Sequence, residues 1–214
     1  MEKSKTLRNV LSALTISFLI LTFHVKKYEY FTFDLNIARG VQSFNPPWFD
    51  FLMVLISKLG DYSGGSLIIL LFICLAIFLR RKREALMIFI STASGTLISQ
   101  TLKYLVGRPR PSSSLINVVG HFGKSDSFPS GHVMFYVSLY GFLLFLTFSM
   151  FRKKIYIRNF LIAVFSSLII LAGVSRIYLG AHWFSDVLGG YLVGFIWLLI
   201  VIHFYNLSSP EPQK

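Results

Sequence analysis

Residues 155–174 read IYIRNFLIAVFSSLIILAGV, a run in which Arg158 and Asn159 are the only strongly polar side chains. An α-helix needs about 20 consecutive apolar residues to cross the hydrocarbon layer of a membrane. This stretch therefore predicts a transmembrane helix. Four other runs of similar length and character predict further spans, at residues 7–25, 85–106, 133–151 and 183–205.

A sixth apolar run, residues 66–79, is short for a span. It follows another apolar segment, residues 48–56, and the two are separated by Gly60-Asp61 and Gly64-Gly65. We interpret 66–79 as the span and 48–56 as an interfacial or half-buried helix, while one bent span across both remains open. The sequence thus predicts an all-α, polytopic bundle of six transmembrane helices, forming a single domain over residues 1–214.

The composition also indicates a membrane protein. Hydrophobic residues make up 54% of the chain and charged residues 14%, well below the share of about 25% typical of soluble domains. The net charge of +12 raises the question of nucleic acid, but the basic residues form short clusters between apolar runs, which favours a membrane surface. We therefore expect the lipid bilayer as partner, no nucleic acid and no obligate protein partner. The single cysteine, Cys74, excludes an internal disulfide and a thiolate metal site.

The placement of the basic residues predicts the orientation in the membrane. Compact basic blocks at residues 80–83 and 152–154 adjoin predicted helix ends, and such blocks stay on the cytoplasmic side. The opposite segments carry six of the nine acidic residues. Both termini then fall in the cytoplasm, as six spans require, and the first run lacks a small-residue cleavage site and is read as a retained helix. We expect a multi-pass protein of the cell membrane.

Under this topology, ionisable residues gather at the extracytoplasmic ends of the helices. Charged groups at this depth are costly and usually functional. Lysine and arginine from different segments can surround phosphate oxygens, whereas Arg108 and Arg110 alone could simply attract lipid headgroups. The residues concerned are Lys103, Arg108, Arg110, His132, Arg176, His182 and Asp186.

Two short motifs supply the remaining chemistry. Ser130, Gly131 and His132 precede an apolar span, so backbone N–H groups at the start of that helix can bind an anion, although Ser130 could also act only as a helix cap. His182 and Asp186 are spaced i,i+4, which on a helix places both on one face. Asp186 would then orient the imidazole of His182 as a nucleophile or a base.

These residues form a tripartite pattern, and on it the chain resembles the type 2 phosphatidic acid phosphatase family. The family signature is K-x6-R-P, then P-S-G-H, then S-R-x5-H-x3-D. This sequence has Lys103 to Pro111, then Pro129 to His132, then Ser175 to Asp186, in the same order and without a departure. The resemblance covers the motifs from residue 103 to 186, and the six-span pattern covers nearly the whole chain.

The resemblance implies a lipid phosphatase with a phosphohistidine intermediate. In that scheme His182 is the nucleophile, Asp186 orients it, and His132 is the general acid and base. The phosphate would bind Lys103, Arg110, Arg176 and the backbone near Ser130 and Gly131. Arg108 lies outside the signature, and we expect it to support the site or to contact a headgroup. No metal or other cofactor is expected, and His121 is expected to be an ordinary loop histidine.

Several substrates remain open within this scheme. By analogy with the compact bacterial members of the family, we favour phosphatidylglycerophosphate, with overlap onto undecaprenyl diphosphate and phosphatidate. The alternatives are undecaprenyl diphosphate as the main substrate, transfer of the phosphoryl group to a second lipid, or a transporter or scaffold without catalysis.

Overall fold

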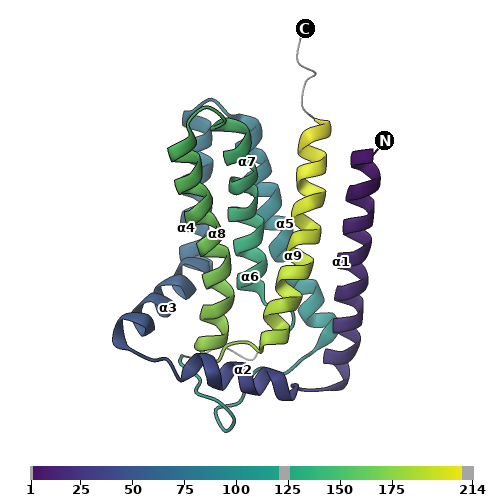
Figure 1. Ribbon diagram of the computed structural model, residues 1–214, viewed down its shortest axis with the longest axis vertical. Coiled ribbons are helices and arrows are strands. Elements are labelled where there is room, and N and C mark those ends of the chain that lie inside the picture. The colour runs from purple at the N-terminus through teal and green to yellow at the C-terminus, as the bar shows by residue number, and fades with distance from the viewer. Residues whose placement is uncertain (1, 121–125, 209–214) are drawn as a thin grey trace.

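The protein is a bundle of helices that run up and down through the molecule (Figure 1). The computed structural model describes residues 2–120 and 126–208, and within these ranges it contains helices and no strand. The prediction of an all-α fold is therefore confirmed. The helices longer than 16 residues are α1 (Glu2–Lys27), α4 (Tyr62–Phe78), α5 (Lys82–Val106), α8 (Ile155–Tyr178) and α9 (Phe184–Leu207).

The helix at the centre of the bundle is built from three consecutive pieces. These are α6 (Gly131–Tyr136), a wider π-helical turn labelled η1 (Val137–Gly141), and α7 (Phe142–Met150). Tyr136 and Phe142 are fully buried in this segment, and α5, α8 and α9 pack around it. Because one end of this central helix begins with Gly131 and His132, its burial fixes the position of that motif.

Five of the predicted spans correspond to long apolar helices, whereas the predicted span at residues 66–79 does not qualify as a span by itself. In the described part of the chain, five helical segments are long and apolar enough to cross a membrane, and α3 (Pro47–Gly60) with α4 makes a sixth only as a pair bent by 67°. The predicted interruption at Gly60-Asp61 is confirmed. The predicted interruption at Gly64-Gly65 is wrong, since α4 begins at Tyr62 and runs through both glycines, with Gly65 packed against the ring of Phe135.

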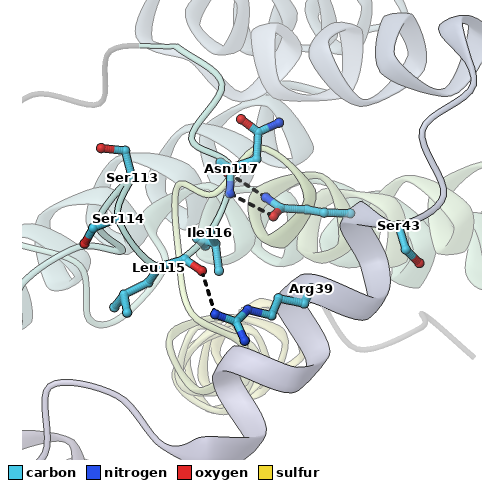
Figure 2. Close-up of a pocket in the computed structure, with 8 residues that line it drawn as sticks. Arg39, Ser43, Ser113, Ser114, Leu115, Ile116 and Asn117 are labelled. Carbon is cyan, nitrogen blue, oxygen red and sulfur yellow. Dashed lines mark hydrogen bonds between the residues drawn. The ribbon is translucent and has the colours of Figure 1, made fainter.

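One helix was not predicted, and it lies across the lower end of the bundle in Figure 1. This helix, α2 (Thr32–Gln42), runs transverse to the long helices. Gln42 exchanges two hydrogen bonds with the backbone of Asn117, at 2.6 and 3.1 Å, and Arg39 donates to the carbonyl of Leu115 at 3.2 Å (Figure 2). These contacts join α2 to the loop that follows α5, so the two segments cover the same end of the molecule.

The two ends of the bundle differ in what they carry. The beginning of α1 and the end of α9 lie together at the upper end in Figure 1, as an even number of passes requires. The end of α5 and the beginnings of α6 and α9 lie at the lower end, together with the end of α8. Each of the three sequence motifs therefore lies at the lower end, which is opposite the ends of the chain.

Candidate active site

A cavity of about 640 Å³ opens at this lower end, between the bend of α3 and α4 on one side and α5, α6 and α8 on the other. Six of the eight predicted site residues line it: Lys103, Arg110, Gly131, His132, Arg176 and His182. Ser130 and Asp186 lie behind the wall, fully buried. The remaining lining residues are Gly60, Asp61, Tyr62, Ser63, Gly65, Ser66, Ile69, Thr96, Ser99, Gln100 and Phe135.

The three predicted phosphate-binding cations are held by the surrounding backbone and hydroxyl groups. Lys103, in the last turn of α5, donates from Nζ to the carbonyl of Asp126 at 2.6 Å. Arg110 donates to the carbonyl of Ala181 at 2.8 Å. These contacts bring side chains from two chain segments to one wall of the cavity.

The third cation comes from α8. Arg176 is 3% exposed and donates from one terminal nitrogen to the hydroxyl of Ser57, on α3. A lysine and two arginines around one cavity can bind the non-bridging oxygens of a phosphate, because arginine offers two parallel donors and lysine a mobile charge.

His182 lies in the turn between α8 and α9. Gly180 makes this turn with a left-handed φ of 66°, and a Cβ there would meet the carbonyl of Asn117 at 2.2 Å, so only glycine fits. Since α9 begins at Phe184, His182 is not on the helix that carries Asp186. The assumption of one shared helical face is therefore wrong, although the two side chains still approach within 3.6 Å.

A residue that the sequence analysis did not single out lies between the two. The hydroxyl of Ser127 donates to Oδ2 of Asp186 at 2.5 Å, and its oxygen lies 3.3 Å from Nδ1 of His182. Because the serine has only one proton, its oxygen accepts the Nδ1 proton of His182. The Nε2 atom of His182 then carries the lone pair, and it lies 3.5 Å from the Arg110 guanidinium.

Asp186 is held in place from several directions. Its Oδ2 accepts from the backbone N–H of Trp183 at 2.8 Å, in the first turn of α9, and its Oδ1 accepts from Arg108 at 2.5 Å. The carboxylate therefore has no freedom to rotate away from Ser127. This rigidity would keep the imidazole of His182 in a single tautomer.

One interpretation of the sequence placed Arg108 against lipid headgroups. Its burial contradicts that interpretation. It is 1% exposed and binds two buried carboxylates, Asp34 at 3.1 Å and Asp186 at 2.5 Å. It also donates to the hydroxyl of Ser185 at 2.7 Å and to the carbonyl of Glu29 at 3.0 Å. A buried guanidinium with this many partners supports the site from behind, which agrees with the other interpretation.

In the motif at residues 130–132, Ser130 is buried behind the cavity wall and His132 lines the cavity. The backbone N–H of Ser130 donates to the carbonyl of Asp186 at 3.0 Å. The Ser130 hydroxyl does not cap α6, and among residues 2–120 and 126–208 it has no hydrogen-bond partner. His132 lies against the cavity, with its Nε2 atom 2.9 Å from Oδ1 of Asp61.

The electrostatics of the site favour a neutral His182. Burial, together with the positive charges of Lys103, Arg110 and Arg176, holds the pKa of His182 well below its ordinary value. Burial also lowers the pKa of the Arg110 guanidinium. A neutral imidazole beside three cations can attack the phosphorus of a bound phosphate.

Neither a metal-binding cluster nor a second catalytic cavity accompanies this site in the described ranges. Within the described ranges, no group of three or more histidine, cysteine, aspartate or glutamate side chains is arranged to hold a metal ion. His121 lies outside those ranges. A second cavity of about 450 Å³, between α2 and residues 113–117, contains none of the predicted catalytic residues (Figure 2).

Three curated proteins are similar in sequence to this chain. A curated relative, phosphatidylglycerophosphatase B of Bacillus subtilis, is 28% identical over 209 residues, covering 94% of this chain and 98% of that protein. The lipid A 4'-phosphatase of Porphyromonas gingivalis is 30% identical over 182 residues, covering 80% and 70%. The undecaprenyl-diphosphatase of Sulfolobus acidocaldarius is 28% identical over 188 residues, covering 85% and 84%.

The fold has a close counterpart among solved structures. The crystal structure of the transmembrane PAP2 type phosphatidylglycerolphosphate phosphatase from Bacillus subtilis superposes with a TM-score of 0.81, at 24% identity, covering 94% of this chain and 98% of that one. This likeness confirms a multi-pass membrane fold. Residues 84–210, which include all three motifs and the helices that carry them, match the PAP2 superfamily, and the chain is a member of that superfamily.

Proposed function

We propose that this protein is a membrane lipid phosphatase that hydrolyses a phosphomonoester, phosphatidylglycerophosphate, at the extracytoplasmic face of the cell membrane. The observation that carries the proposal is the cavity in which His132 and His182 face Lys103, Arg110 and Arg176. The relatives named above act on lipid phosphates, and the one that covers nearly the whole chain is named for this substrate.

The reaction proceeds in two steps at phosphorus. Nε2 of His182 attacks, the bond from phosphorus to the leaving oxygen breaks, and His132 gives that oxygen a proton. Water then attacks the phosphohistidine while His132 takes its proton, which releases inorganic phosphate and the free His182. Lys103, Arg110 and Arg176 stabilise the charge on the non-bridging oxygens in both steps, and such fixed charges supply much of the acceleration.

Four further groups complete this proposal: the Ser130 hydroxyl, the Gly131 backbone N–H, Asp186 and Ser127. The hydroxyl of Ser130 and the backbone N–H of Gly131 lie at the start of the central helix, where the positive end of the helix favours an anion. Asp186 and Ser127 hold His182 in the tautomer that leaves Nε2 free to attack. None of these roles calls for a metal ion, so we propose that the reaction is independent of metal.

Phosphate release by the purified protein in detergent tests the proposal. Phosphatidylglycerophosphate, undecaprenyl diphosphate and phosphatidate are supplied separately, each in the presence of EDTA, to the wild type and to His182→Ala. We expect release from phosphatidylglycerophosphate at the highest kcat/KM, and a loss of about a thousandfold or more in the variant. Acid-labile phosphate on the wild type during turnover, and not on His182→Ala, identifies the intermediate.

The other outcomes discriminate between the alternatives. Equal release from both proteins would remove His182 from the role of nucleophile. Loss of activity in EDTA that zinc or magnesium restores would overturn the metal-independent mechanism. A faster reaction with undecaprenyl diphosphate would make that lipid the main substrate. Phosphate transfer to an added alcohol, in place of release, would indicate a phosphotransferase.

A further inference from the structure

Asp61 lies beside the histidine to which the proposed function assigns proton transfer. Its Oδ1 atom is 2.9 Å from Nε2 of His132, and its side chain is 50% exposed where it lines the cavity. Of the lining residues in the described part of the chain, Asp61 alone is acidic. The carboxylate is therefore the one fixed negative charge that a substrate in this cavity meets.

The position of Asp61 is not explained by its place in the chain. It precedes the first turn of α4 at the N-cap, where an aspartate normally accepts a hydrogen bond from the helix backbone. Here the carboxylate makes no such bond and points to His132, 71 residues away in sequence. The Asp61 side chain therefore contacts His132 and does not cap α4.

The bend between α3 and α4 is shaped for this contact. A Cβ at Gly60 would lie 2.8 Å from the ring of His132 and 2.7 Å from the ring of Tyr136, so only glycine lets the bend come this close. The 67° angle then turns the next residue, Asp61, toward the ring. Nearby polar groups on the same wall are neutral, among them Tyr62, whose hydroxyl accepts from Gln100 at 3.1 Å.

The leaving group of any substrate must approach the same atom. In the proposed mechanism the leaving oxygen takes its proton from His132, so the atoms next to that oxygen come near Asp61. A hydroxyl one carbon away can donate to the carboxylate. A phosphate in the same place, as in a lipid diphosphate, brings a second negative charge against it, which is unfavourable in a partly buried site.

We propose that Asp61 selects among lipid phosphates by the chemical group that lies next to the leaving oxygen. It favours a phosphomonoester whose leaving alcohol carries a neighbouring hydroxyl, and it disfavours a diphosphate. An ester whose leaving alcohol has no such hydroxyl should have a kcat/KM between those of the other two substrates. This inference rests on the proposed function for the assignment of His132, and it adds the chemical class of substrate that the site accepts.

The test compares substrate ratios, which a loss of folding or of general activity does not change. The kcat/KM values for phosphatidylglycerophosphate, phosphatidate and undecaprenyl diphosphate are measured with the purified full-length wild type and with Asp61→Asn. We expect the ratio of the first substrate to the diphosphate to fall by about tenfold or more in the variant, because the repelling charge is lost. The ratio of kcat/KM for phosphatidylglycerophosphate to kcat/KM for phosphatidate should change less.

Two further variants serve as controls. Asp61→Glu keeps the charge and should keep the ratio within about threefold of the wild type. Asp50→Asn removes the same charge from an exposed residue of α3, which binds Tyr178 and does not line the cavity, and should leave the ratio unchanged. Asp61→Asn with a wild-type ratio, or with all three substrates slowed equally, would overturn the inference.

Failure of the proposed function would look different. If the wild type itself prefers undecaprenyl diphosphate, the assigned substrate is wrong, yet the change of ratio in Asp61→Asn still tests the role of the carboxylate. If His182→Ala retains full activity, the mechanism is wrong whatever the ratio. A wild-type preference for phosphatidylglycerophosphate that persists in Asp61→Asn rejects the inference and leaves the proposed function intact.

Discussion

Ser127 joins the carboxylate of Asp186 to the ring of His182, where a direct pair would be expected. The direct approach of 3.6 Å is too long for a hydrogen bond, whereas the serine is within 3.3 Å of the ring and 2.5 Å of the carboxylate. The orientation of His182, the proposed nucleophile, therefore depends on a hydroxyl that does not line the cavity.

Replacement of Ser127 by alanine should lower kcat with little change in KM. The imidazole loses the acceptor that fixes its tautomer, while Lys103, Arg110 and Arg176 still bind phosphate. We expect a loss of about tenfold or more in kcat. Steady-state kinetics with phosphatidylglycerophosphate measure it, and Ser127→Thr, which keeps the hydroxyl, is the control. Wild-type kcat in the alanine variant would show that Asp186 acts on the ring without the serine.

The charge state of His182 gives a second prediction. Its pKa lies well below the ordinary value because the ring is buried among cations, so the ring stays neutral as the pH falls through the range in which an exposed histidine takes up a proton. In Arg110→Gln one of these cations is lost, and the pKa should rise. NMR titration of ring-labelled histidine in the substrate-free protein, assigned with His182→Ala, measures both values. An equal or lower pKa in Arg110→Gln would contradict this account.

The contacts that the sequence did not reveal are those whose two partners are distant along the chain. The motifs place Lys103, Arg110, His132 and His182 at one cavity because they end or begin adjacent spans. Arg108, by contrast, binds carboxylates 74 and 78 residues away, and no local pattern announces such pairs. Ser127 lies two residues before the P-S-G-H motif, and its spacing to His182 has no periodicity that would reveal the contact.

At the scale of whole elements, Arg108 connects three segments: the loop after α5, α2 through Asp34, and α9 through Asp186. Both ion pairs are fully buried. Removal of one partner from a buried pair leaves an uncompensated charge, which costs more than the pair itself contributes.

Arg108→Met should therefore destabilise the protein by about 3–5 kcal/mol, because two buried carboxylates lose their counter-charge. Thermal or denaturant unfolding in detergent measures the loss. Arg39→Met is the matched control, since Arg39 is exposed and donates to one backbone carbonyl, and it should cost about 1 kcal/mol or less. Equal stability of the two variants would mean that the buried network is not what holds α2 and α9 together.

The contact between α6 and α9 depends on close approach of their backbones. A Cβ at Gly190 would lie 2.8 Å from the carbonyl oxygen of Ser130, and one at Gly194 would lie 3.1 Å from Val137. Small residues commonly bring membrane helices together in this way. The approach places the start of α6, with Gly131 and His132, against the start of α9.

Gly190→Ala should push these helices apart, with a loss of about 1–3 kcal/mol in stability and a lower kcat. Gly40→Ala in α2 is the control, because nothing lies within 4 Å of its Cβ, and it should be neutral or stabilising by up to about 1 kcal/mol. Unfolding curves and phosphate release on both variants give the comparison. A tolerated Gly190→Ala would show that α9 can shift without disturbing the motif.

The long helices were predictable because their apolar runs match the thickness of a membrane, whereas α2 was not. In its sequence, one or two apolar residues alternate with polar ones, a mixture that is typical of a loop between spans. The polar residues include Asp34, Asn36, Arg39 and Gln42. It is helical because Asp34 accepts from the backbone N–H of Phe31 at its start and because Gln42 is anchored to Asn117 at its end. The first anchor is local, but the second joins residues 75 positions apart and depends on the tertiary structure.

For the molecule as a whole, the basic blocks at residues 80–83 and 152–154 lie at the end opposite the cavity. Cytoplasmic loops of membrane proteins are enriched in such residues. We therefore predict that the cavity opens outside the cell, with the start of α1 inside.

Labelling of single cysteines in intact cells checks this orientation. Cys74 is replaced by serine, and a cysteine is introduced either as Ser113→Cys, beside the cavity end, or as Lys153→Cys, between α7 and α8. A membrane-impermeant maleimide should label the first variant in intact cells and the second only after lysis. The reverse labelling pattern would show that the orientation is opposite to the predicted one and that the cavity faces the cytoplasm.

The buried network around Arg108 has a consequence for the order of events during biosynthesis. A ribosome makes Asp34 and Arg108 first, and they can pair as soon as the first half of the chain has been inserted. The proposed nucleophile and its carboxylate emerge only with the turn before α9 and its first residues, His182 to Asp186. A chain paused in the translocation machinery before that point has most of its helices but lacks the proposed nucleophile. The enzyme becomes able to act on the lipids around it only when its last helix arrives.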